Sequence, residues 1–391
     1  MSLAGKKIMF AWELGEGLGH LPVLKGIASA LRSEGVQPVF VLRETQNAIR
    51  ALKDVGGELR TAPHWAKPAL PVQRSGSLAD ILASNGYSQG DHAAAMIQSW
   101  DKIIDEVRPD LIIADHAPSA LLSAHGRIPV ALVGNGFAVP PADDDWFPPF
   151  NAGVGTIDAQ RPVFDAISQG FERLGRPAPT SITAPFRGAF RGIYTFPVLD
   201  TYRAIRQEGL LGPIEPMPSL APLPERRRIF IYSAAEIAKI DMLMQCIMAI
   251  GPEASVYLRG SPGPRAAILR SRGVEVFYTP PPLAQVLPRA SVVFSHVGPG
   301  FTNAALACGR PHLMFPRHFE AHSAAMGLVE AGIGIRLDDF EPASFVAAYE
   351  RACSDDNMRD AAQKAGAAAQ EFMARARALE VSVAAVKRLL S

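Results

Sequence analysis

Short apolar strands alternate with amphipathic helices along the first half of the chain. An apolar run spans Lys7 to Trp12, and Leu24, Ile27 and Leu31 then recur at the spacing of one helix face. Further strands are expected at residues 38–42, 110–114, 129–133 and 192–196, with helices near 91–108 and 158–175. Strands that alternate with helices predict a parallel sheet covered on both faces.

The same alternation restarts after a proline-rich segment at residues 212–224, which lacks either periodicity and is typical of an interdomain connection. Strands are then expected at residues 228–232, 255–258, 274–277, 291–295, 312–315 and 333–336, and an Ala-rich helical stretch at 359–390. We therefore expect an α/β protein of two Rossmann-like, doubly wound domains facing across a cleft. The predicted boundaries are 1–212, a linker at 213–227, and 228–391 with the terminal helix.

Charge and cysteine content exclude several classes of protein. The chain has 391 residues, with 39 basic and 38 acidic side chains and a net charge of +1, so nucleic acid is a poor candidate partner. The three cysteines show no C-x-x-C spacing, which argues against a disulfide framework or a cysteine zinc site. The first apolar run ends at Glu13, too soon for a signal peptide or membrane span. We expect a cytoplasmic protein, and peripheral membrane contact through an apolar patch stays open.

The turn after the first strand carries the first candidate chemistry. Gly15 and Gly17 precede His20 at the start of a helix, where glycines let a ligand approach and helix amides point outward. A dinucleotide fingerprint would share these glycines and could use Glu44 for a ribose, but His20 occupies its third glycine position. We interpret His20 as a general base, with a structural cap as the alternative.

A base of this kind needs a partner that orients it. Asp115 follows a predicted strand, so its carboxylate is expected at the same sheet edge as His20. An aspartate there can fix the imidazole tautomer and stabilise the imidazolium. The alternative is a helix N-cap for the segment after Pro118, and His116 could take either role.

A second glycine turn follows the predicted strand at residues 291–295. His296, Gly298, Gly300 and Thr302 lead directly into a helix, so free amides and the helix dipole face one point and predict a diphosphate site. Glu320, one loop further on, could accept hydrogen bonds from sugar hydroxyls; the alternative is an ordinary solvated charge.

Together these motifs resemble the GT-B fold glycosyltransferases of the UDP-glycosyltransferase type, with similarity to bacterial MurG-like enzymes, over nearly the whole chain. Gly19-His20 with Pro22 resembles the family's opening motif, and the strand ending at Asp115 resembles the one that carries its base-orienting aspartate. The stretch from His296 to Gly334 resembles its donor signature and is the strongest match.

The resemblance implies an inverting, metal-independent hexosyl transfer without a cofactor, in which a UDP- or dTDP-sugar is the cosubstrate. His20 would deprotonate a hydroxyl of a small-molecule, lipid or glycan acceptor as that oxygen attacks the anomeric carbon. The amides after His296, with His296 as a further donor, would meet the charge on the departing nucleoside diphosphate.

Several positions depart from the family pattern. Ala304 stands where a glutamate usually binds the ribose, and Phe301 where a small hydroxyl residue is common. The family's Asp-Gln pair appears as Glu320-Ala321, its following asparagine as Ala324, and no tryptophan aligns near residues 280–282. The identity of the nucleotide therefore stays open.

The acceptor side offers only aromatic candidates. The residues expected to overhang the cleft, or else to belong to the core, are Trp65, Phe137, Trp146, Phe147 and Phe150. The acidic run at 143–145 is interpreted as a solvated loop. Two other functions stay open: a sugar-nucleotide 2-epimerase of the same architecture, and a nucleotide-sugar-binding protein with weakened catalysis.

Overall fold

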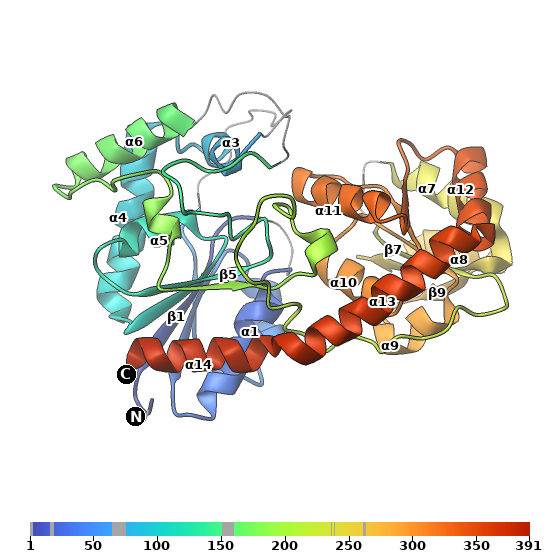
Figure 1. The fold of residues 1–391 in the computed structure, drawn as a ribbon, viewed down its shortest axis with the longest axis horizontal. Coiled ribbons are helices and arrows are strands. Elements are labelled where there is room, and N and C mark those ends of the chain that lie inside the picture. Colours follow the sequence, from blue (N-terminus) through green and yellow to red (C-terminus); the bar gives the residue numbers. More distant parts are fainter. Residues whose placement is uncertain are drawn as a thin grey trace. The chain divides into compact units, whose positions relative to one another are not determined.

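The computed structural model describes residues 3–15, 19–64, 76–150, 160–235, 237, 239–260 and 263–391. The chain forms two compact units (Figure 1). Unit 1 comprises Met1–Thr195, Thr201–Glu215 and Ala376–Ser391, and unit 2 comprises Phe196–Asp200 and Pro216–Arg375.

Unit 1 is built on a parallel six-stranded sheet in the order β3-β2-β1-β4-β5-β6. Its strands are β1 (Lys7–Trp12), β2 (Gln37–Leu42), β3 (Glu58–Thr61), β4 (Leu111–Asp115), β5 (Val130–Gly134) and β6 (Phe190–Ile193). Its first six helices are α1 (Leu21–Arg32), α2 (Thr45–Leu52), α3 (Leu78–Ser84), α4 (Gly90–Val107), α5 (Pro118–Ala124) and α6 (Gln160–Arg173). The central strands β4 and β5 are buried throughout because helices cover both faces of the sheet.

Unit 2 repeats this architecture in the order β12-β11-β10-β7-β8-β9. Its strands are β7 (Ile229–Ala234), β8 (Ala254–Arg259), β9 (Glu275–Phe277), β10 (Val292–Ser295), β11 (His312–Met314) and β12 (Gly334–Arg336). Its helices are α7 (Ile240–Ile250), α8 (Gly263–Ser271), α9 (Leu283–Val286), α10 (Pro299–Ala307), α11 (Phe319–Glu330), α12 (Pro342–Ser354) and α13 (Asp356–Ala376). The predicted α/β class with two doubly wound sheets is confirmed.

Each sheet has a topological switch point. The chain lays its second and third strands on one side of the first, and its fourth to sixth strands on the other. The switch therefore lies between β1 and β4 in unit 1, and between β7 and β10 in unit 2. Open α/β sheets bind ligands at the carboxyl ends of the strands that flank this point.

The terminal helical stretch differs from its predicted assignment to the second domain. It breaks at Arg377, whose φ is +47°, and α14 (Ala378–Leu390) belongs to unit 1. Ala378 and Val386 enter the core of unit 1, and the hydroxyls of Tyr194 and Ser382 are hydrogen-bonded at 2.6 Å. Apolar spacing identified the helix but could not identify the sheet that it covers.

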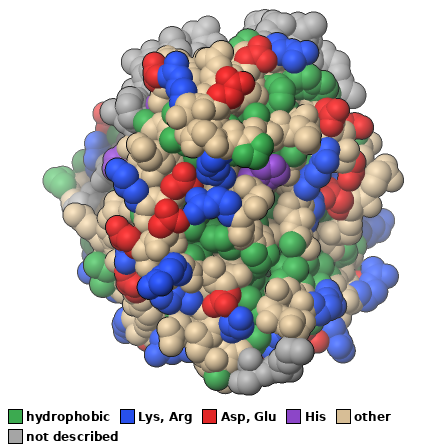
Figure 2. Space-filling view, turned by 90° about the vertical axis from the view of Figure 1, so that its left-hand side faces the viewer, with side chains coloured by type: hydrophobic (Ala, Val, Ile, Leu, Met, Phe, Trp, Pro, Cys, Tyr) green, Lys and Arg blue, Asp and Glu red, His purple; other side chains and the backbone are tan. Residues whose placement is uncertain are grey.

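The surface of unit 1 carries both signs of charge. On the face drawn in Figure 2, basic and acidic side chains are interspersed, in keeping with the net charge of +1. Within the described part of the chain, no helix is long and apolar enough to cross a lipid bilayer.

Candidate functional site

His20 and Asp115 lie together at the switch point of unit 1. Nδ1 of His20 is 2.9 Å from Oδ1 of Asp115, and the side chains are 18% and 2% exposed. A carboxylate only accepts hydrogen bonds, so the His20 Nδ1–H donates, and in the neutral ring the lone pair lies on Nε2. This is the arrangement that orients a general base.

The local structure argues against the capping alternatives for both residues. His20 occupies the N-cap position of α1, but its side chain makes no capping hydrogen bond. The N-cap of α5 is Ala117, so Asp115 does not cap that helix. Asp115 instead ends β4, where it pairs in register with Trp12 of β1. Neither residue is accounted for by helix termination.

Gly15 lets the backbone approach the Nε2 atom of His20 closely. Its φ is +97°, and a Cβ built there would lie 2.7 Å from Nε2, closer than real Cβ contacts. Any larger residue at position 15 would therefore be strained and would press on the nitrogen that carries the lone pair.

A buried carboxylate, missed by the sequence analysis, anchors the same turn. Glu13, directly after β1, is 1% exposed and accepts hydrogen bonds from Tyr87 Oη at 2.7 Å and from Ser119. Ser119 donates both its amide, at 2.8 Å, and its hydroxyl, at 2.7 Å. Burial raises the pKa of Glu13 to about 7, although these donors lower it. Only its place after a strand, among apolar neighbours, could have indicated this role.

The predicted acceptor aromatics divide between core and surface. Phe137, Phe147 and Phe150 are 8%, 1% and 2% exposed, so they pack inside unit 1. Trp146 is 38% exposed, and Arg161 lies over its ring at 5.2 Å. Trp65 lies outside the described residues.

The glycine turn of unit 2 opens onto the N-terminus of α10. Gly298 is the N-cap, and a Cβ built at Gly298 or Gly300 would meet nothing within 4 Å. The amides of Gly300 and Phe301 fall within the first turn, where helix N–H groups have no intrahelical acceptor. Val297 just before has a φ of +61°, a strained value for a β-branched residue, and its side chain is 2% exposed.

Both ring nitrogens of His296 have hydrogen-bond partners. Its Nδ1 is 2.8 Å from the carbonyl of Phe315, which can only accept, and its Nε2 is 2.8 Å from Oγ of Ser233. Burial lowers the pKa of His296, so the ring is neutral: Nδ1–H donates to Phe315 and Nε2 accepts from Ser233. The predicted donation from His296 to a phosphate would require this arrangement to change. Ser233, on β7 across the switch point, is the residue that sequence analysis missed.

Thr302 has a hydrogen-bond partner in its own helix turn, and Glu320 lies in the first turn of its helix. Thr302 is 1% exposed, and its hydroxyl donates to the carbonyl of Gly298 at 2.9 Å, which braces the glycine turn. Glu320 is half-buried in the first turn of α11, where an acidic side chain favours the helix dipole.

The departures from the donor signature are packed into the core of unit 2. Ala304 is 2% exposed and belongs to an aromatic cluster with Phe301, and Phe301 stacks on Tyr232 at 5.0 Å. Ala321 is fully buried. At positions 304 and 321 the chain therefore presents apolar core where the signature has polar ligands.

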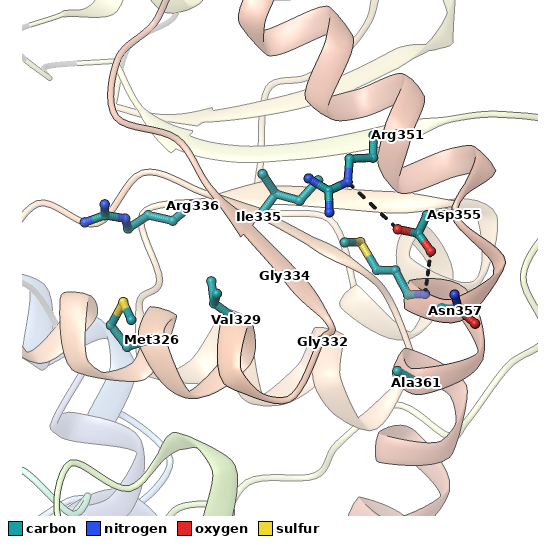
Figure 3. A pocket seen from close by; sticks show the side chains of 11 residues that line it. Met326, Val329, Gly332, Gly334, Ile335, Arg336, Arg351, Asp355, Asn357 and Ala361 are labelled. Atoms are coloured by element: carbon teal, nitrogen blue, oxygen red, sulfur yellow. Dashed lines mark hydrogen bonds and ion pairs between the residues drawn. The ribbon is translucent and has the colours of Figure 1, made fainter.

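A cavity of about 690 Å³ lies elsewhere in unit 2, between α11, β12 and the start of α13 (Figure 3). Met326 and Val329 line one side of the cavity. Arg351 and Asp355 line another, and the Nε atom of Arg351 lies 3.8 Å from Oδ2 of Asp355. None of the predicted site residues lines it.

Comparison with known proteins gives relatives in sequence and in structure, although no protein-family model matches the chain. The elloramycin glycosyltransferase ElmGT of Streptomyces olivaceus is 26% identical over 356 residues, which is 81% of this chain and 83% of that protein. The L-demethylnoviosyl transferase of Streptomyces niveus is 25% identical over 279 residues, which is 68% of each.

Solved structures share the fold over its whole length. The calicheamicin glycosyltransferase CalG4 aligns with a TM-score of 0.71 at 19% identity, covering 98% of both chains. The glycosyltransferase VinC in complex with dTDP aligns with a TM-score of 0.68 at 15% identity, covering 98% of this chain and 99% of that one. The chain has the GT-B fold that these glycosyltransferases share.

Proposed function

We propose that the enzyme transfers a hexosyl residue from a dTDP-sugar to a hydroxyl of a small natural-product acceptor, with His20 as the general base. The hydrogen bond between His20 Nδ1 and Asp115 at the switch point of unit 1 carries this proposal. The choice of dTDP is supported by the structural match to VinC, whose structure holds that nucleotide. ElmGT and the L-demethylnoviosyl transferase are both named as transferases, which favours transfer over epimerisation.

In this mechanism Nε2 of His20 takes the proton of the acceptor hydroxyl as the oxygen attacks the anomeric carbon. The bond from that carbon to the diphosphate oxygen breaks, and the leaving nucleotide keeps the electron pair. Asp115 then stabilises the imidazolium that forms. In unit 2 the amides of Gly300 and Phe301 stabilise the growing charge on the diphosphate, since they lie in the first turn of α10, where Gly298 and Gly300 leave space for a ligand.

Loss of the base should lower turnover and leave donor binding intact. We expect His20→Ala to reduce turnover by about 10²–10⁴-fold, because proton transfer from a positioned base contributes that much. Asp115→Asn should act in the same direction, because an amide can reverse the tautomer. Turnover is measured as release of dTDP and glycoside by mass spectrometry, and dTDP affinity by calorimetry. His125→Ala is the matched control, and unchanged turnover in His20→Ala would remove His20 from the mechanism.

Donor binding should depend on the open turn in unit 2. We expect Gly298→Val to abolish dTDP and UDP binding in calorimetry, because the new side chain fills the space through which a phosphate reaches the α10 amides. Gly209→Val is the control, since a Cβ there also meets nothing within 4 Å, its φ is not left-handed, and it lies outside α10. Tight nucleotide binding by Gly298→Val would place the diphosphate elsewhere.

A panel of dTDP- and UDP-sugars, with and without acceptors, separates the open alternatives. Acceptor-dependent release of nucleotide supports transfer, and release without acceptor supports epimerisation or hydrolysis. No release with any donor would indicate a binding protein.

A further inference from the structure

His116, directly after Asp115, has a backbone conformation that is uncommon for residues other than glycine. Its φ is +48°, in the left-handed region. The carbonyl of His116 accepts a hydrogen bond from the amide of Leu14 at 2.9 Å, which ties this strained residue to the turn after β1. Strain of this kind persists only where the surroundings impose it, and it concentrates at functional sites.

The ring of His116 lies parallel to that of His20. The two ring centroids are 5.7 Å apart with an angle of 11° between the planes. Trp12 also stacks on His20, with the ring centroids 5.4 Å apart and an angle of 28° between the planes. Stacking on these two rings restricts rotation of the His20 side chain, while Asp115 fixes which ring nitrogen carries the proton.

Neighbouring side chains pack tightly around the His116 ring. Phe137 lies against it at 5.6 Å, and the adjoining cavity, lined by residues such as Leu82 and Leu121, measures about 10 Å³. That volume is at the lower limit for a single water molecule. Burial, with smaller contributions from His20 and Arg43, lowers the pKa of His116 to about 3, so the ring is neutral at working pH.

We propose that His116 is a positioning residue for His20: its ring stacks on the imidazole and holds it in the orientation that presents Nε2 beside Gly15. This inference rests on the proposed role of His20 as the base. The strained backbone at position 116 then serves to place the His116 ring against the ring of His20.

Two substitutions test separately the contributions of the His116 ring, its nitrogens and its left-handed backbone. Asparagine tolerates left-handed φ, so H116N keeps the backbone and removes the ring. H116F keeps a ring and removes the nitrogens. We expect H116N to lower kcat by about 10- to 10²-fold, as small misplacements of catalytic groups do. KM for the dTDP-sugar should stay unchanged, and H116F should retain kcat within a few-fold.

Arg108→Asn is the matched control, because Arg108 also has a left-handed φ, of +49°, at the end of α4. Wild-type kcat in H116N would overturn the inference. So would an H116F enzyme that melts like the wild type but is as slow as H116N, since the nitrogens would then matter. If kcat falls in His20→Ala but not in H116N, only the inference about His116 fails. If kcat is unchanged in His20→Ala, the proposed function itself fails.

A spectroscopic measurement keeps the test valid if H116F does not fold. In ¹⁵N NMR of histidine-labelled protein, we expect His20 of the wild type to show one tautomer, protonated on Nδ1. In H116N the His20 signals should broaden through exchange, because the ring then rotates away from Asp115 for part of the time. Sharp and unshifted His20 signals in H116N would show that Asp115 alone holds the ring.

Discussion

At the residue scale, Glu13 is a buried acid that anchors the turn leading to His20, the proposed base. It lies two residues from Gly15 and joins three segments: the end of β1, Tyr87 between α3 and α4, and Ser119 in the first turn of α5. Burial holds its pKa near 7, so the protonated form dominates in mildly acidic solution. Asp115 and His116 immediately precede α5, so this anchor also fixes their approach to His20.

Stability should therefore fall as pH rises through the range in which Glu13 ionises. The pKa is 4.5 in the unfolded chain and about 7 in the folded one, so between these values the folded protein binds more protons. The free energy of unfolding should then decrease by about 3 kcal/mol from pH 4.5 to pH 7 through this group. Urea unfolding at several pH values should show this loss in the wild type and a flatter profile in Glu13→Gln. Glu172→Gln, at an exposed position on α6, should keep the wild-type slope.

Some site residues could be predicted from sequence because their placement follows from topology alone. His20 follows the first strand and Asp115 ends the fourth, and those strands are neighbours in any sheet of this order. The partners of His296 could not be predicted, since they depend on the packing of Ser233 and Phe315 from other strands. The stacking of His116 on His20 depends in the same way on a backbone angle that no local pattern reveals.

At the element scale, α14 is the helix whose assignment depends most on tertiary contacts. Its side chains at Ala378 and Val386 complete the core of unit 1, and Lys387 forms an ion pair with Glu34 at 2.7 Å. Short elements such as β3, α2, α3 and α5 were absent from the sequence prediction. They are four to eight residues long, too short for either hydrophobic period to emerge.

Two valines on α14 provide a matched test of its contribution. Val386 is 1% exposed and Val381 is 37% exposed, so the two alanine variants share one change in helix propensity and differ in burial. We expect Val386→Ala to lower the free energy of unfolding by about 1–3 kcal/mol and Val381→Ala to have little effect. Hydrogen exchange should locate the loss in α1 and β6, on which α14 packs. Equal effects of the two variants would contradict the packing of α14 on unit 1.

At the scale of the whole molecule, one strand order occurs twice, and each switch point carries a side-chain hydrogen bond to a histidine. In unit 1 the partners are His20 and Asp115, and in unit 2 they are His296 and Ser233. The alternation of strands and helices was sufficient to predict both sheets. The identity of the nucleotide was not predictable, because Ala304 and Phe301, which stand where the resembling family has polar residues, belong to a hydrophobic cluster.

The return of the last helix to unit 1 has a practical consequence for protein engineering. Both chain ends belong to unit 1, so residues 216–375 form a continuous insert flanked by junctions on either side. Exchanging that insert, together with the five residues Phe196–Asp200, would replace the whole of unit 2, the proposed donor side, and leave unit 1 unaltered. Chimeras joined between units 1 and 2 at residue 215 alone would separate α14 from the core that it completes.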